Sequence, residues 1–187
     1  MSPEIFDLFP LSVFKDKVNI SQDEKNTIID FILNTEKKTS NLDKKKGDAW
    51  LGDTKGQEFL FKNSIMKNLT NIISQKIRLY TNMLNIDNDK LSFFYQRSWA
   101  TISRQKERIQ PHSHDQSNIS FAYYPLKPKD SGDIKFILEP PNEIAKGLFA
   151  KEKLDLGLLK SVNIRNAPNV DLYIEENEII IFPSKIK

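Results

Sequence analysis

The stretch ISFAYYPL at residues 119–126 decides the fold class, because aromatic and β-branched residues of this kind are typical of β-strands. Four other runs of similar character are expected to form strands, at residues 93–103, 133–138, 170–174 and 178–182. The runs are separated by clusters of Pro, Gly, Asn and Asp, which favour turns. The second half of the chain therefore predicts a series of short strands.

Two amphipathic helices are predicted before the strands. The first begins at Ser21, where SQDE is a capping box: the Ser21 hydroxyl accepts an early backbone N–H, and Glu24 reaches back to the cap. The second runs from about Ser64 to Leu84 with apolar residues three and four apart, which is the spacing of one helical face. Its apolar residues are Ile65, Leu69, Ile72, Ile73, Ile77, Tyr80, Met83 and Leu84. Both apolar faces are expected to pack against the core.

The remaining segments complete an α+β chain. A loop rich in Gly and charge spans residues 39–57, and Trp50 within it is expected to be a buried anchor. The insert at residues 140–160 is expected to hold one short helix near residues 145–150. Two helices followed by a run of strands indicate a helical support region at residues 1–90 and a strand-rich core at residues 91–187.

Composition excludes several classes of protein. The 187 residues contain no Cys, which excludes a disulfide framework, a thiolate zinc site and a cysteine nucleophile. The net charge is +3 with acids and bases interleaved, so nucleic acid is not favoured as a partner and the lysines at 37–46 are expected to lie in a solvated loop. No run approaches the roughly 18 apolar residues of a membrane span, so we expect no membrane partner and a cytoplasmic location.

The two histidines of the chain stand one residue apart. His112 and His114 occur in PHSHD at residues 111–115. In an extended segment, residues i and i+2 face the same side, so two imidazoles, or an imidazole and a carboxylate, can reach one metal ion. A histidine pair in a polar surface loop is equally consistent with no metal at all, and the pair alone leaves both readings open.

Several motifs nevertheless follow one another in a family-specific order. They are LFP at 8–10, Trp99, PHSH at 111–114, SFAYY at 120–124, SGDIKF at 131–136 and IIIFPS at 179–184. Over nearly its whole length the chain resembles the iron(II)/2-oxoglutarate-dependent dioxygenases, and in particular the prolyl-hydroxylase-like branch and the small oxygenases of bacteria and phages. The resemblance implies a double-stranded β-helix, or jelly roll, with helices packed on its larger sheet.

The resemblance also implies a metal site and a co-substrate site. The family binds Fe(II) through His-X-Asp and a distal His, which leaves positions for 2-oxoglutarate and O₂. His112 matches the first ligand, and His114 stands where the Asp usually is. Tyr124 matches a tyrosine that donates a hydrogen bond to the distal carboxylate of 2-oxoglutarate, and Ile134 matches an apolar residue packed on it. Without the resemblance, Tyr124 and Ile134 would be interpreted as ordinary core residues of strands.

The chain departs from the family pattern at its C-terminal end. The family carries the distal His, and later a basic residue that pairs with 2-oxoglutarate, after a segment like FPS at 182–184. No His or matching basic residue follows here, and Arg97, Arg104, Arg108 and Arg165 are cations at other positions. A jelly roll uses eight strands and only five or six are expected, so we expect the last strands to be missing and a partner chain or dimer to complete the sheet.

Three functions remain open at this stage. The first is an Fe(II)/2-oxoglutarate-dependent dioxygenase that hydroxylates an unidentified substrate, which the histidine pair favours. The second is a catalytically inactive jelly roll that serves as a binding or structural module, for example in a phage particle, which the missing third ligand favours. The third is a cupin-like enzyme with another divalent metal, for which Glu139, Glu143 and Glu178 are candidate ligands.

Overall fold

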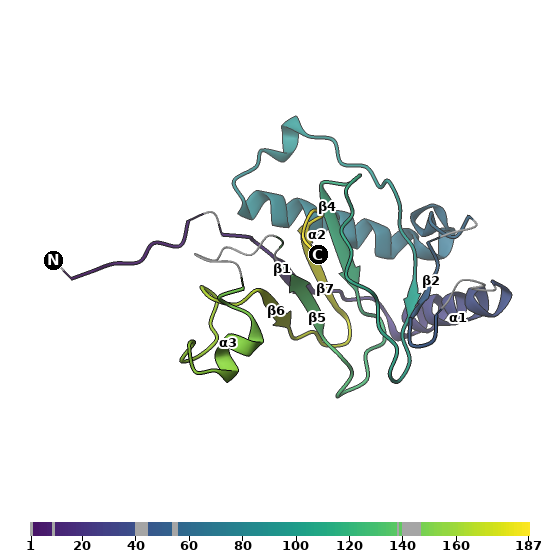
Figure 1. The fold of residues 1–187 in the computed structure, drawn as a ribbon. Helices are drawn as coiled ribbons and strands as arrows, with labels where there is room; N and C mark the ends of the chain where they lie inside the picture. The colour runs from purple at the N-terminus through teal and green to yellow at the C-terminus, as the bar shows by residue number, and fades with distance from the viewer. Residues whose placement is uncertain (1, 9, 40–44, 54–55, 138, 140–146) are drawn as a thin grey trace.

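The protein is a layered α+β structure in which a three-stranded sheet lies between two long helices and a smaller sheet (Figure 1). The computed structural model describes residues 2–8, 10–39, 45–53, 56–137, 139 and 147–187. All strand pairs between the described strands are antiparallel. The α+β class predicted from the sequence is therefore confirmed.

The elements follow one another as predicted in broad outline, helices first and most strands later. The strands are β1 (Phe14–Lys17), β2 (Trp50–Leu51), β3 (Thr101–Ile102), β4 (Ile119–Tyr123), β5 (Ile134–Ile137), β6 (Asn169–Leu172) and β7 (Glu178–Pro183). The α-helices are α1 (Gln22–Lys38), α2 (Lys67–Met83) and α3 (Lys151–Asp155), and the 3-10 helices are η1 (Leu60–Lys62), η2 (Ser64–Met66) and η3 (Asn88–Lys90). The sheets have the orders β1-β7-β4, β2-β3 and β5-β6, and the described strands close into no barrel.

Strand β7 is the centre of the fold, because it is buried on both of its faces. Ile179, Ile180 and Ile181 are all 0% exposed. Successive side chains of a strand point to opposite faces. Ile179 and Ile181 accordingly pack in the core beneath the helices, whereas Ile180 and Phe182 pack in a second core against β5 and β6. The predicted strand at residues 178–182 is thus the one that joins the two layers.

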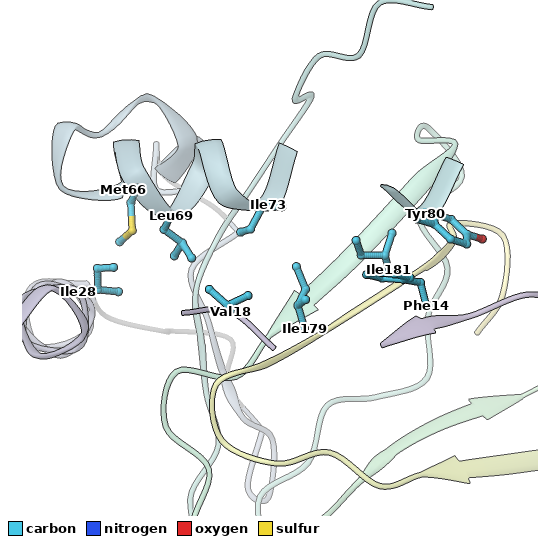
Figure 2. Packing of buried hydrophobic residues seen from close by; sticks show 9 residues of the cluster. All are labelled: Phe14, Val18, Ile28, Met66, Leu69, Ile73, Tyr80, Ile179 and Ile181. Carbon is cyan, nitrogen blue, oxygen red and sulfur yellow. The ribbon is translucent and has the colours of Figure 1, made fainter. Parts of the chain in front are cut away.

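The helical layer covers one face of the three-stranded sheet, as the apolar stripes predict. Figure 2 shows Tyr80 of α2 over Phe14 and Ile181 at one end of this core, and Ile28 of α1 beside Met66 and Leu69 at the other. The prediction for α2 is wrong at its last turn. Met83 and Leu84 are 70% and 40% exposed, because the helix extends beyond the core at this end.

The first helix begins at the predicted cap, but its glutamate has a different partner. Ser21 Oγ accepts a hydrogen bond from the Glu24 backbone N–H at 3.1 Å. The Glu24 carboxylate instead accepts from Asn68 Nδ2, at 3.1 Å through Oε1 and at 2.9 Å through Oε2. Half of the capping box is therefore confirmed. The other half of the motif links α1 to the first turn of α2 instead.

Three local predictions are corrected. Of the strand expected at residues 93–103, only Thr101–Ile102 forms a ladder, while Tyr95 packs its ring on Phe61 and Phe121. The short helix lies at 151–155 rather than 145–150, of which residues 145 and 146 lie outside the described residues. Strand β1, which lies in the expected support region, pairs with β7 and so belongs to the central sheet.

The prediction of a buried Trp50 is confirmed, at 3% exposed.

Three ion pairs lie in or beside the central sheet: Lys76–Asp16 joins α2 to β1, Lys25–Glu176 joins α1 to the turn before β7, and Lys15–Glu178 joins β1 to β7. The Lys76 ammonium holds the pKa of the Asp16 carboxyl below its ordinary value, and Lys25 does the same for the pKa of Glu176. Burial raises the pKa of Glu178, but the backbone N–H of Glu175 and the Lys15 ammonium outweigh burial and leave that pKa lowered. These three carboxylates are more stable as anions in the folded protein than in the unfolded chain.

We therefore expect the protein to lose stability in acid. A lowered carboxyl pKa adds stability that is present above the ordinary pKa, 3.8 for Asp and 4.5 for Glu, and is lost as the pH falls through the folded value. Urea unfolding at pH 7 and at about pH 3 should show the loss. Lys76→Gln should reduce the difference between the two pH values, whereas Lys90→Gln, at an ion pair whose lysine side chain is 82% exposed, should not. Equal stability at both pH values would contradict the expectation.

Candidate metal centre

His112 and His114 lie side by side close to the end of β7. Their ring centroids are 4.8 Å apart and the ring planes stand at 87°. The segment that carries them is tied to the strand, because the His114 backbone N–H donates to the Ser184 carbonyl at 2.9 Å. Ser184 is 0% exposed and shares a hydroxyl hydrogen bond of 2.8 Å with Ser120 of β4. The His114 backbone is thus tied to a fully buried residue at the end of β7, while His112 is exposed.

One ring nitrogen of His112 is hydrogen-bonded to the backbone. His112 Nδ1 lies 2.8 Å from the Gln110 carbonyl oxygen, which can only accept a hydrogen bond. The proton of a neutral His112 is therefore on Nδ1, and Nε2 keeps a free lone pair. A hydrogen bond of this kind orients an imidazole that binds a metal through its other nitrogen.

The surroundings of His114 favour its neutral form. Burial is the main cause that lowers its pKa, and the charges of His112 and Arg97 lower it further, against a weaker opposing effect of Asp115. The Trp99 ring supplies part of this environment, with its centroid 5.4 Å from that of His114. Since only the neutral imidazole binds a metal ion, these surroundings suit His114 to act as a ligand.

The donor set at this position consists of two nitrogens. Within the described ranges, no group of three or more His, Asp and Glu side chains is arranged to hold a metal ion. Asp115, the nearest carboxylate in the sequence, accepts a hydrogen bond from the Ser113 hydroxyl at 2.8 Å. Two imidazoles fit two of the three protein positions of an iron(II) facial triad by ligand type. A third protein ligand is not among the residues that the structure brings to the pair.

Tyr124 and Ile134 lie together in the core between the two sheets. Tyr124 follows β4 directly, and its backbone N–H donates to the Glu178 carbonyl at 2.9 Å. Ile134 opens β5 and pairs with Leu172 of β6. Both side chains pack on the cluster of Phe136, Ile174, Ile180 and Phe182. The alternation of β4 sends Tyr123 to the opposite core, beneath the helices.

The Tyr124 phenol remains protonated far above neutral pH. Burial, reinforced by the nearby Asp133, raises the pKa of Tyr124 to about 12. A protonated phenol can donate a hydrogen bond to a carboxylate. Tyr124 therefore has the protonation state that its implied role requires.

The same shift leads to an expectation for alkaline solution. A raised tyrosine pKa adds stability that is present below the ordinary value of 10 and is lost as the pH rises toward about 12. We expect Tyr124→Phe to lose less stability than the unmodified protein between pH 9 and pH 11, measured by urea unfolding. Tyr80→Phe is a second comparison, because burial also raises the pKa of Tyr80. If Tyr124→Phe loses as much stability between pH 9 and pH 11 as the unmodified protein does, the result contradicts a raised pKa of Tyr124.

Arg97 is a charged neighbour of the histidine pair that sequence reasoning did not place there. Its guanidinium carbon lies 5.5 Å from the centroid of the Trp99 ring, and its charge acts on His114. The signal in the sequence is small: Arg97 precedes Trp99 by two residues, which places both on one side of an extended segment. A surface hollow lined in part by Lys127, Tyr173 and Glu175 does not include the pair.

Comparison with protein-family models and with curated proteins finds no match for the chain. No helix in the described part of the chain is long and apolar enough to cross a membrane. The histidine pair, its neighbours and the motifs of the sequence are the features that bear on function.

Proposed function

We propose that the protein is an Fe(II)/2-oxoglutarate-dependent dioxygenase that binds iron through His112 and His114. The observation that carries the proposal is the arrangement of the pair, with rings 4.8 Å apart and His112 Nδ1 held by a backbone carbonyl. A neutral imidazole oriented in this way by its second nitrogen is typical of metal-binding histidines. The low pKa of His114 supports the same role.

The layer order supports a jelly roll that is completed by further strands. The larger sheet carries the helices on one face, and the β5-β6 sheet packs on its other face. Seven strands are described, and Ile137 of β5 donates its backbone N–H to the Lys187 carbonyl rather than to β6. This hydrogen bond covers the end of the edge of β5 that faces away from β6, and no described strand pairs along the rest of that edge. A partner chain or a second copy that adds strands there is the proposed source of a third ligand.

The residues of the chain divide the work between binding and orientation. His112 and His114 would hold the iron, and the bound iron with 2-oxoglutarate and O₂ supplies the oxidising chemistry. Tyr124, protonated at neutral pH, would donate a hydrogen bond to a carboxylate of the co-substrate. Ile134, which packs on the same apolar cluster as Tyr124, would pack on the co-substrate, as the resemblance implies.

The test is an anaerobic titration of the purified protein with Fe(II) and 2-oxoglutarate. We expect the visible charge-transfer band of iron chelated by the oxoacid, and we expect His112→Ala to abolish it. Ser113→Ala, between the two histidines, is the matched control and should keep the band. If no band forms at any concentration, the chain alone is not an oxygenase.

The second candidate is a catalytically inactive binding or structural module of the same fold. The observation that favours it is the number of ligands, because the described residues bring two rather than three to one point. A module of this kind should neither form the band nor bind Fe(II) more tightly than His112→Ala does. Tight, His112-dependent binding of Fe(II) would contradict it.

A further inference from the structure

The stretch that precedes β1 is acidic, apolar and exposed. Residues 2–8, here called the arm, carry Glu4 and Asp7 and no basic side chain. The large apolar side chains of the arm are between 71% and 74% exposed, and they are Ile5, Phe6 and Leu8. Figure 1 shows the arm leading away from the sheets and helices. The arm therefore presents apolar side chains that the body of its own chain does not cover.

A second exposed segment carries the opposite charge. Residues 156–165, between α3 and β6, carry Lys160 and Arg165 and no acidic side chain. The exposed apolar side chains of this segment are Leu156, Leu158, Val162 and Ile164. The 156–165 segment is thus complementary to the arm in two respects, because it offers cations to acidic side chains and apolar surface to apolar side chains.

One ion pair joins the arm to the 156–165 segment within a single chain. Two nitrogens of Arg165 donate to the Asp7 carboxylate, at 2.9 and 3.0 Å. Both side chains are more than half exposed, and an ion pair so accessible to water contributes little to holding two segments together. Ile164, beside Arg165, stays 86% exposed although the ion pair is made. The contact within one chain therefore matches the charges and leaves the apolar surfaces open.

The direction of the arm explains why its own chain does not cover it. The Tyr80 hydroxyl donates to the Ser12 carbonyl at 2.9 Å and β1 begins at Phe14, so the chain that follows the arm is fixed on the central sheet. From there the arm leads outward rather than along the body (Figure 1). A second copy that approaches from outside offers the same 156–165 segment to the arm, and its own arm can reach back. Such a reciprocal contact closes into a symmetric dimer.

We propose that two copies of the chain form a dimer by exchanging arms, so that the arm of each copy lies on the 156–165 segment of the other. Asp7 then pairs with Arg165 of the other copy, and the apolar side chains of the two segments are buried together. The occupant is a second copy because the segment that complements the arm belongs to this chain and already pairs with it. The two acidic side chains of the arm disfavour an anionic lipid surface. The inference does not depend on the proposed metal site.

The first experiment measures the mass of the full chain in solution over a dilution series, by sedimentation velocity. We expect a monomer–dimer equilibrium. Phe6→Ser and Leu158→Ser, one in each segment, should each weaken the dimer about tenfold or more, as truncation of a central interface residue can do. Phe94→Ser is the matched control, since Phe94 is 86% exposed and lies outside both segments. A chain that is monomeric at every concentration, or a dimer that Phe6→Ser and Leu158→Ser weaken no more than Phe94→Ser does, overturns the proposal.

The second experiment separates exchange between copies from the contact within one chain. Asp7→Arg and Arg165→Asp each place like charges at the ion pair, so each variant alone should dimerise about tenfold more weakly, because two exposed pairs are lost in every dimer. In an equal mixture, each arm meets the opposite charge on the other variant, and heterodimers should form with nearly the original affinity. Fluorescent labels of two colours report the heterodimers. If the mixture dimerises no better than the separate variants, the ion pair lies within one chain and the exchange is overturned.

A stability measurement separates loss of the dimer from loss of structure. The substituted side chains are all more than half exposed, so each variant should unfold at nearly the same urea concentration as the unmodified protein. The comparison is made at a protein concentration at which the chains are monomeric, because binding to a second copy adds to the apparent stability.

Discussion

Ile181→Ala and Ile180→Ala are each expected to lower the free energy of unfolding by about 3 kcal/mol, within the usual range for truncating a buried isoleucine. Both side chains are 0% exposed on β7. Ile181 faces the helices and Ile180 faces β5 and β6, so each variant opens a cavity in a different core. Urea unfolding followed by circular dichroism measures both losses.

Two further variants make this expectation specific. Ile181→Val should cost about 1 kcal/mol, because it removes a single methylene group. Ile164→Ala, at a side chain that is 86% exposed, should change stability by less than about 0.5 kcal/mol. Losses below 1 kcal/mol in both β7 alanine variants would show that this strand is not the centre of the fold.

His114→Ala is expected to weaken Co(II) binding by more than about 100-fold, since even residues that only orient a metal ligand contribute about 10- to 100-fold. The chain would then offer one imidazole in place of two. The Trp99 ring lies 5.4 Å from the His114 ring, so quenching of tryptophan fluorescence by Co(II) reports binding directly. The tryptophan fluorescence of the unmodified protein should be quenched at far lower Co(II) concentrations than that of the variant.

His114→Asp is the matched variant for this second prediction. A carboxylate at this position is the ligand that the resemblance to the dioxygenases implies, so His114→Asp should keep most of the affinity that His114→Ala loses. His114→Ala should unfold at nearly the same urea concentration as the unmodified protein, which separates loss of a ligand from loss of structure. Equal Co(II) affinity in all three proteins would refute the metal site.

The elements that were predicted correctly carry their signal within one segment. The cap at Ser21 and the apolar stripe of α2 depend on residues three and four apart, and each is present in the structure. The strand predicted at 119–126 forms over Ile119–Tyr123, because aromatic and β-branched residues favour extended backbone. Local chemistry was sufficient for these elements.

The elements that were missed depend on a distant partner. Strand β1 is FKDK, which has no apolar run, and it is a strand because β7 lies beside it. Residues 93–98 have strand-like composition, yet Tyr95 turns its ring to Phe61 and Phe121, and the segment makes only an isolated bridge, from Ser98 to Phe59. Composition predicts extended backbone, but it carries no information about which neighbour accepts the hydrogen bonds.

The residues of the candidate site also differ in whether their place can be predicted from one short segment. The histidine pair was visible as a motif, since both residues lie within one short segment. Arg97 matches no position of the family pattern, so the sequence alone gives it no role. Its place beside the pair arises from contacts between segments far apart in the chain, including the pairing of β2 with β3 and the bond to Asp53.

The order β1-β7-β4 has a consequence for how the protein is made. Phe14 pairs with Ile181, so the central sheet joins residues near the two ends of the sequence. During synthesis, β1 and both long helices leave the ribosome well before β7, and their apolar faces have no central strand to cover until residues 178–183 emerge. Contacts of such long sequence separation slow folding. The central sheet therefore forms late, when β7 pairs with β1 and β4. Chaperones that shield apolar segments should associate with the nascent chain until this pairing occurs.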